Sequence, residues 1–73
     1  MTSTIKDLIA TYDATPIWSL SAIKWKGMAE EFERAGLLEE ACECYHHASV
    51  TARRVFFRDR MRAKADSLAK RLA

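Results

Sequence analysis

The residues most able to do chemistry lie together in the segment 42–47, which reads Cys-Glu-Cys-Tyr-His-His. Thiolate and imidazole groups are the usual ligands of zinc in proteins. If the segment is helical, Cys42 and His46 share one face, because residues four apart are neighbours on a helix. Cys44 and His47 share a different face. A structural zinc site needs four converging ligands, so we expect no metal site in one chain, although a second copy could complete one.

Catalysis at the same segment would need more than a cysteine near a histidine. A nucleophilic thiol needs an orienting base, a group that stabilises developing negative charge and a cleft for the substrate. A few short helices offer little concave space, and the sequence has no glycine-rich phosphate loop, HExxH or GxSxG motif. We therefore expect a non-enzymatic protein without a cofactor, in which Cys42 and Cys44 act as small, partly buried hydrophobic residues.

Length and composition favour a small helical domain that gains burial from a partner. The chain has 73 residues, of which 49% are hydrophobic, and it holds only 2 glycines and 1 proline. Such a short chain buries only about 60% of its unfolded surface, and two cysteines two apart on a helix cannot form a disulfide without breaking it. We expect a single all-α domain over residues 1–73 that forms a homodimer or another homo-oligomer. With no signal peptide and no membrane-spanning run in the sequence, we expect a cytoplasmic protein without a membrane partner.

A short first helix is expected within residues 1–14. Thr2, Ser3 and Thr4 offer an N-cap, and Asp7 follows Thr4 in a capping-box arrangement. The apolar residues fall on one helical face: Ile5, Leu8, Ile9 and Tyr12. So short a helix would be weak on its own.

A helical hairpin is expected over residues 15–52. Thr15 can cap the first of its helices, and Pro16 fits the first turn, where a missing N–H costs nothing. This helix should run to about Ala35, with an apolar stripe at alternating spacings of four and three: Trp18, Ala22, Trp25, Ala29 and Phe32. Gly36 suits the position just past the helix end, where a left-handed residue is favoured, and Leu37 can pack back against the last turn.

Residues 38–73 contain neither glycine nor proline and carry two apolar stripes that are out of phase. The first stripe is Leu38, Ala41, Tyr45, Ala48, Ala52 and Val55. The second stripe is Phe57, Met61, Ala65, Leu68 and Leu72. Ser49-Val50-Thr51 is also the weakest helix-forming stretch here, because serine and β-branched residues lose most in a helix. We favour a break or bend near residues 49–54, and one long helix is the alternative.

The hairpin resembles a tetratricopeptide repeat over residues 25–48. That motif places aromatic, small and glycine residues at the same spacings, and the matching positions are Trp25, Met28, Ala29, Phe32, Gly36, Ala41, Tyr45 and Ala48. Met28 stands in the usual leucine position, and Arg53 stands where the motif has a proline. Only one repeat is present, whereas solenoids need about three. The resemblance implies a single close-packed hairpin.

A second resemblance covers residues 17–65. This region is similar to small enterobacterial and prophage regulators in three features. These are a glycine turn after a helix, the run Ala41, Tyr45 and Ala48, and an aromatic, arginine-rich helix. The resemblance is to the AraC negative regulators (the ANR family) and to the PerC-like regulators. In those families the third helix commonly ends near an arginine followed by a cysteine, which the segment 62–65 lacks, and the middle helix is more basic than here. The resemblance implies a phage- or plasmid-borne factor that binds a transcriptional regulator as a dimer.

Charge divides the chain in two. Residues 1–52 hold 4 Lys and Arg against 8 Asp and Glu, net −4, whereas residues 53–73 hold 8 against 2, net +6. The basic helix expected over 53–73 carries arginines four apart beside aromatic residues. Aromatic and arginine side chains are typical anchors of protein interfaces. We therefore predict a partner-binding surface made of Phe56, Phe57, Met61, Arg54, Arg58 and Arg62.

The sequence leaves three functions open for this surface. The first is a small regulator that binds a transcription factor or another host protein. The second is direct DNA binding, in which the arginine stripe follows the phosphates and binding weakens with salt. The third is a structural subunit of an assembly, held by pairing between basic and acidic helices.

Overall fold

The chain folds into a small bundle of helices. The computed structural model describes residues 5–72, except for the side chains of Ile5 and Leu8. It is all-α, as predicted. In chain order the elements are α1 (Ile5–Ala14), the 3-10 helix η1 (Ile17–Ser19), α2 (Ala22–Arg34), α3 (Leu38–Thr51) and α4 (Val55–Leu72). None of these helices combines the length and the apolar character that crossing a bilayer requires.

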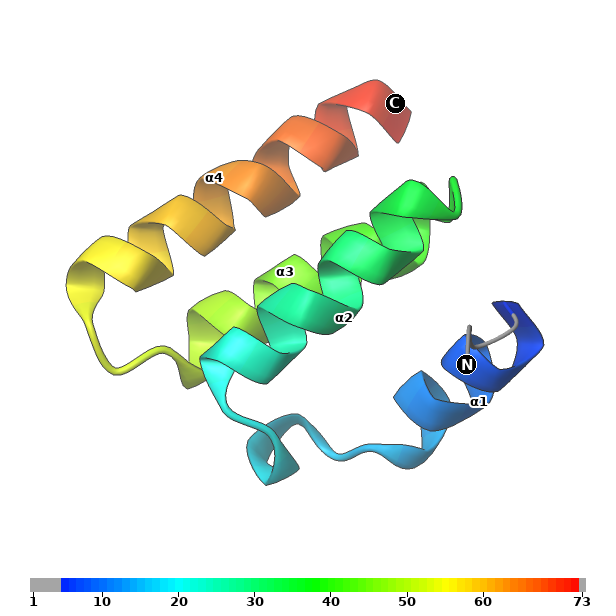
Figure 1. Ribbon diagram of the computed structural model, residues 1–73. Helices are drawn as coiled ribbons and strands as arrows, with labels where there is room; N and C mark the ends of the chain where they lie inside the picture. Colours follow the sequence, from blue (N-terminus) through cyan, green and yellow to red (C-terminus); the bar gives the residue numbers. More distant parts are fainter. Residues whose placement is uncertain (1–4, 73) are drawn as a thin grey trace.

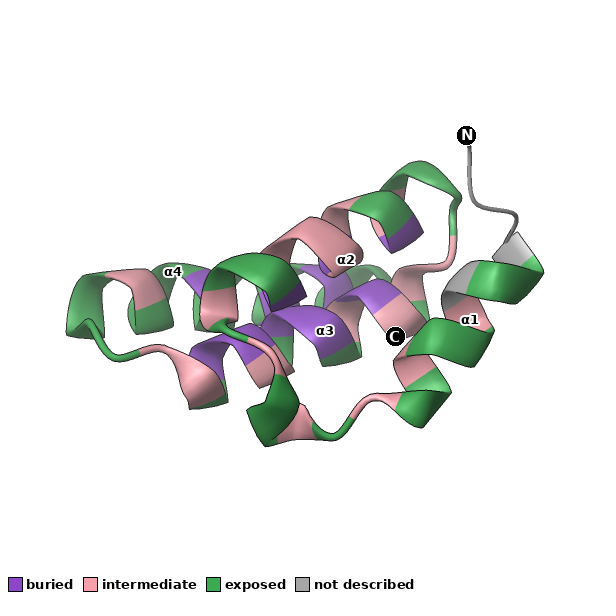
Figure 2. Ribbon diagram, turned by 60° about the horizontal axis from the view of Figure 1, so that its bottom comes forward, coloured by how far each residue is buried: buried purple, intermediate pink, exposed green. Residues whose placement is uncertain are grey.

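Helix α3 lies in the middle of the bundle and packs against both α2 and α4 (Figure 1). Successive helices run antiparallel, so the start of α2, the end of α3 and the start of α4 lie at one end of the bundle. The buried faces of the three helices turn toward one another (Figure 2). The core consists of Trp25, Ala29, Phe32, Ala41, Cys44, Tyr45, Ala48, Met61, Ala65 and Leu68. It contains the middle of the second predicted stripe and the predicted hairpin core except for two residues. Met28 is half-buried against the core, and Gly36 is exposed in the turn.

The start of α2 differs from the prediction. The helix begins at Ala22 instead of near Thr15, and Ser21 caps it by accepting a hydrogen bond from the backbone N–H of Lys24 (3.4 Å). Residues 17–19 form the separate helix η1, whose carbonyl at Ile17 accepts the indole N–H of Trp25 (2.8 Å). Leu20 then adopts an extended conformation, with φ −119° and ψ 147°. The predicted stripe therefore loses its first member, and Trp18 is 75% exposed.

The turn between α2 and α3 follows the prediction for Gly36, which has a φ of +80°. Its N–H donates to the carbonyl of Glu33 (3.1 Å), and the N–H of Leu37 donates to that of Phe32 (2.9 Å). These two bonds define the Schellman motif, which satisfies carbonyls at a helix end. Leu37 also packs against the core, as expected.

The two glycines of the chain are expected to respond in opposite directions to alanine. Gly36→Ala should lower the free energy of unfolding by about 1–2 kcal/mol, because an L-residue at this positive φ is strained. Gly27→Ala should raise it by about 0.5–1 kcal/mol, because Gly27 lies inside α2 and an added Cβ meets no atom within 4 Å. Urea denaturation of both variants measures the two effects, and equal shifts of the same sign would contradict the assigned turn.

The predicted break near residues 49–54 is confirmed. Helix α3 ends at Thr51, Ala52 is extended with φ −68° and ψ 132°, and α4 begins at Val55. The Ser49 and Thr51 hydroxyls donate to carbonyls three or four residues earlier, and such bonds compete with helix continuation. The break turns α4 back along α3, which buries the middle of the second stripe and leaves Leu72 largely exposed.

Helix α1 packs on the rest of the bundle through Ile9 and Tyr12, which contact the core. The proposed caps Thr2, Ser3 and Thr4 lie outside the described residues, as do the side chains of Ile5 and Leu8. Thr15 does not begin α2, and its hydroxyl instead donates to the carbonyl of Thr11 near the end of α1 (2.5 Å).

Candidate interaction surface

A groove lies at the end of the bundle where the start of α2, the end of α3 and the start of α4 meet. We call it the end groove. It is lined by residues 18–23, residues 50–54 and Phe57, and it has a volume of about 770 Å³. Its lining comes from two parts of the chain that are far apart in the sequence, residues 18–23 and residues 50–54 with Phe57. The break at 52–54 and the cap at Ser21 place them together.

The end groove carries several large apolar side chains that the fold does not cover. Trp18 is joined there by Ile23, which is 73% exposed, and by Val50, which is 43% exposed. Val55 and Phe56, which follow the groove residue Arg54 on the first turn of α4, are exposed as well. Single exposed apolar residues are common, but contiguous groups mark binding sites. Covering one such side chain gains about 1.5–3 kcal/mol, so the end groove favours an apolar partner.

The charge of the end groove is positive. Arg53 and Arg54 line it, and no aspartate or glutamate is among its lining residues. Residues 22 and 23 lie in the first turn of α2 and Phe57 in the first turn of α4. The N-terminal end of a helix has a partial positive charge. Both helix starts add to the field of the two arginines, whereas the C-terminal end of α3, which also lines the groove, carries a partial negative charge and opposes it. The two arginines therefore set the positive sign of the groove.

The predicted partner-binding residues separate into exposed and buried ones. Phe56 is 72% exposed, whereas its neighbour Phe57 is half-buried between the core and the end groove. Met61 is only 3% exposed. The prediction that Met61 lies on the binding surface is therefore wrong: it shares a helical face with Ala65 and Leu68, which pack on α3.

The predicted arginine stripe is exposed along α4. Arg54, Arg58 and Arg62 all face solvent, and Arg58 forms a 3.6 Å ion pair with its neighbour Asp59. The guanidinium of Arg60 lies over the ring of Phe56, 5.6 Å from its centroid. Only Arg54 of this stripe belongs to the end groove. The other two arginines extend the basic surface along the helix.

Neither Ile23 nor Val50 is among the site residues predicted from the sequence, although both line the end groove. Each lies outside the apolar stripe predicted for its helix, and an apolar residue away from the core-facing stripe is the signal that could have marked them. Trp18 was assigned to the core stripe, because a helix starting at Thr15 would have turned it inward.

The cysteine and histidine segment is divided among different surroundings. Cys44 is buried, and burial together with Glu43 and Glu40 raises the pKa of its thiol to about 12. Cys42 is half-buried and its thiol donates to the carbonyl of Ala65 (3.2 Å). His46 is exposed, while His47 packs against α1. Within residues 5–72, no three His, Cys, Asp or Glu side chains come together as metal ligands would.

His47 belongs to an aromatic cluster that attaches α1 to the hairpin. Its ring stacks on Tyr12 at a centroid distance of 5.8 Å and meets the edge of Trp25 at 4.7 Å. Tyr12 also contacts Phe32 edge-on and donates its hydroxyl to the carboxylate of Glu43. Burial, followed by that hydrogen bond, raises the pKa of Tyr12. The Nδ1 atom of His47 is buried without a hydrogen-bond partner.

The stability of the fold should decrease with acid because of His47. Burial, and to a lesser extent His46, lowers the pKa of His47 from its ordinary value of 6.5, while Glu43 acts in the opposite direction. Below about pH 6.5 the unfolded chain binds a proton at this position that the folded chain does not, so acid favours unfolding. His47→Phe keeps the ring and should remove this part of the pH dependence. Urea denaturation at several pH values between about 7 and 5 measures how the free energy of unfolding depends on pH. The variant His46→Gln, at an exposed position, is the control and should keep most of this pH dependence.

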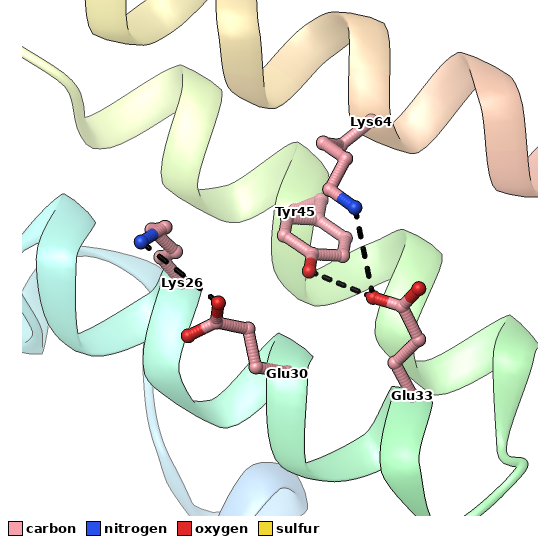
Figure 3. Close-up of polar contacts among 5 residues, drawn as sticks. All are labelled: Lys26, Glu30, Glu33, Tyr45 and Lys64. Atoms are coloured by element: carbon pink, nitrogen blue, oxygen red, sulfur yellow. Dashed lines mark hydrogen bonds and ion pairs between the residues drawn. The ribbon is translucent and has the colours of Figure 1, made fainter.

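A polar cluster joins the three long helices on another side of the bundle (Figure 3). The hydroxyl of Tyr45 on α3 donates to the Glu33 carboxylate on α2 at 2.8 Å. The ammonium of Lys64 on α4 lies 4.0 Å from the same oxygen and 5.5 Å from the centroid of the Tyr45 ring. The acidic hairpin and the basic helix thus meet within one chain. Since these groups satisfy one another, we assign the cluster to stability and not to binding.

Comparison with known proteins leaves the end groove to be interpreted from its own chemistry. No protein-family model matches the chain, and no curated protein or solved structure matches it either.

Proposed function

We propose that this chain is a small non-enzymatic regulator that acts by binding another protein at the end groove. The observation that carries the proposal is the group of uncovered apolar side chains at one end of an otherwise packed bundle, with Trp18, Ile23 and Phe56 each more than two-thirds exposed. Two arginines border this apolar surface. Aromatic residues beside arginine are frequent among the residues that dominate binding energy.

The surroundings of the cysteines support a binding role over a catalytic one. A thiol is a nucleophile only as the thiolate. The pKa of Cys44 is raised to about 12, so its thiol stays protonated at neutral pH. Burial and the neighbouring carboxylates of Glu43 and Asp66 also raise the pKa of Cys42. Neither cysteine has the lowered pKa that a catalytic thiol needs.

The resemblance to prophage regulators makes a bacterial transcription factor the first partner class to test. A phage- or plasmid-borne factor of this kind would change the activity of its target by contact. We also propose self-association as a homodimer through a face other than the end groove, because a small chain gains burial from a second copy. Cytoplasmic action follows from the proposed target.

Direct DNA binding is the second candidate, and the exposed arginines 54, 58 and 62 favour it. An arginine stripe four residues apart can follow a phosphate backbone. Binding of this kind weakens steeply as salt increases, with a slope set by the number of phosphates neutralised. A fluorescence titration with duplex DNA at several salt concentrations tests it. Binding that is lost on replacing all three arginines by glutamine would favour DNA as the target.

Variants of the end groove and of the adjacent Phe56 test the proposed function. Tagged Ile23→Asp and Phe56→Asp should each lose a bacterial protein that the wild type retains in a pull-down, while helix content by circular dichroism stays unchanged. Phe57→Asp should weaken binding too, with some loss of stability because Phe57 also packs on the core. Ser67→Asp, an exposed position on α4 outside the groove, is the matched control. Retention of the same partners by all three variants would contradict the proposal.

A further inference from the structure

The end groove also indicates the chemistry of its occupant, and this inference rests on the proposed function. The apolar part of the groove is formed by Trp18, Ile23 and Val50, which the chain itself does not cover. A fitting partner must present apolar side chains at that place. The same partner must lie close to Arg53 and Arg54.

The charge of the lining selects among apolar partners. The groove holds two arginines and no carboxylate, so its charge is positive. A basic partner would place like charges together, which costs binding energy and slows association. An acidic partner would neutralise the arginines at the same time as its apolar side chains enter the groove.

A second copy of this chain is a poor occupant. A two-fold dimer joins the same patch of both copies, so the interface would collect Arg53 and Arg54 of both copies. The groove supplies no acid to separate them. The exposed glutamates 31 and 39 lie near the end of α2 and the start of α3, at the opposite end of the hairpin.

The backbone around the groove indicates how a partner would bind. Every regular element within residues 5–72 is a helix, so this part of the chain offers no strand edge for an extended peptide to pair with. Affinity must come from side chains. A partner helix can place apolar residues into the groove at spacings of three and four while its flanking residues reach the arginines.

We propose that the end groove binds an acidic amphipathic helix of a partner protein. The apolar face of that helix covers Trp18, Ile23 and Val50, and its glutamate or aspartate residues pair with Arg53 and Arg54. The occupant is thus defined by an apolar stripe with carboxylates on its flanks.

A displayed peptide library tests this occupant on the whole chain. The library holds peptides of about 16 residues, roughly 24 Å long as a helix, with apolar residues at positions i, i+3, i+4 and i+7. The flanking positions vary among Glu, Gln and Lys. Selection runs in parallel on the wild type, on the double variant Arg53→Glu/Arg54→Glu and on Ile23→Asp. Lys70→Glu, at an exposed position near the end of α4, is the charge control outside the groove. Trp18→Ser replaces Ile23→Asp if that variant loses helix content.

The wild type should enrich glutamate at the flanking positions, and the double variant should enrich lysine instead. The best acidic peptide should bind the double variant and Ile23→Asp each at least about tenfold more weakly, and it should bind Lys70→Glu within about twofold of the wild type. Enrichment of neutral or basic peptides on the wild type, still dependent on Ile23, would overturn the acidic partner while the protein-binding surface stands. Peptide binding that needs neither Ile23 nor Trp18 would overturn both proposals.

Two further results would also overturn the acidic helix as occupant. One is a wild type that is a dimer in the absence of peptide, together with an Ile23→Asp variant that has the mass of a monomer. A second copy of the chain would then fill the groove. The other is displacement of the best peptide by a short DNA duplex at physiological salt, with DNA binding lost in the double variant.

Discussion

Replacing Trp25 by alanine is expected to lower the free energy of unfolding by about 3–5 kcal/mol, the usual range for a large aromatic residue in a core. Trp25 has no exposed surface, and it contacts His47 and Tyr12 in the cluster that attaches α1. Its indole N–H also holds η1 through the carbonyl of Ile17. A domain of this size has roughly 4–11 kcal/mol of stability in total. The variant should therefore lose much of its helix content at room temperature, as circular dichroism with urea denaturation will measure.

Trp18→Ala is the matched control for this prediction. Trp18 is the other tryptophan of the chain and is largely exposed in the end groove. Its replacement should change the free energy of unfolding by no more than about 0.5 kcal/mol. Trp25→Phe should fall between the two, since it keeps most of the bulk and loses the hydrogen bond. Equal losses for Trp18→Ala and Trp25→Ala would mean that α2 begins earlier than Ser21 and buries both indoles.

Met61→Asp is expected to destabilise the fold by at least about 3 kcal/mol, whereas Phe56→Asp should leave stability within about 0.5 kcal/mol of the wild type. The aspartate at position 61 would be a buried charge without a partner, because Met61 lies among Ala65, Leu68 and the residues of α3. Position 56 is exposed in the first turn of α4, where a negative charge is favourable. Thermal denaturation of the two variants compares them.

The variants Met61→Asp and Phe56→Asp together distinguish a structural residue from a binding residue. Phe56→Asp should lose partner binding with its fold intact, whereas Met61→Asp should lose both together. Met61→Leu conserves volume and should cost less than about 1.5 kcal/mol, and it should keep binding. A folded Met61→Asp that lacks only partner binding would restore Met61 to the surface.

Much of the fold could be predicted from local signals. Gly36 predicts its own turn, because few other residues tolerate a positive φ. The weak helix formers at 49–51 and the change of stripe predict the break before α4. The residues Trp25, Ala29, Phe32, Ala41, Tyr45 and Ala48 are buried, as their periodicity indicates. Whether the hairpin is of the tetratricopeptide type stays a prediction.

The start of α2 could not be decided from local signals, because two caps compete. Thr15 with Pro16 and Ser21 are both good starts for a helix. The contact between the Trp25 indole and the Ile17 carbonyl, which spans eight residues, accompanies the later start. The helix propensities of the individual residues do not reflect such a contact.

The binding surface was predicted in part, for a similar reason. The sequence indicates Phe56, Phe57 and the arginines at 54, 58 and 62, but the end groove combines residues 18–23 with residues 50–54 and Phe57, which only the fold brings together. Met61 was assigned both to the stripe and to the surface, and periodicity favours the stripe. His47 and Tyr12 meet because α1 folds back on the hairpin, and no local pattern relates them.

The most direct test of the end groove uses the two tryptophan indoles in an NMR titration of the ¹⁵N-labelled chain with the partner identified by pull-down. The indole of Trp18 lies in the groove, and that of Trp25 is buried and bonded to Ile17. We predict that the Trp18 indole signal shifts or broadens as partner is added, together with the amides of Ile23 and Arg54, while the Trp25 indole signal stays in place. Binding that leaves the Trp18 signal unmoved and shifts the amides of the last turns of α4 instead would contradict the account.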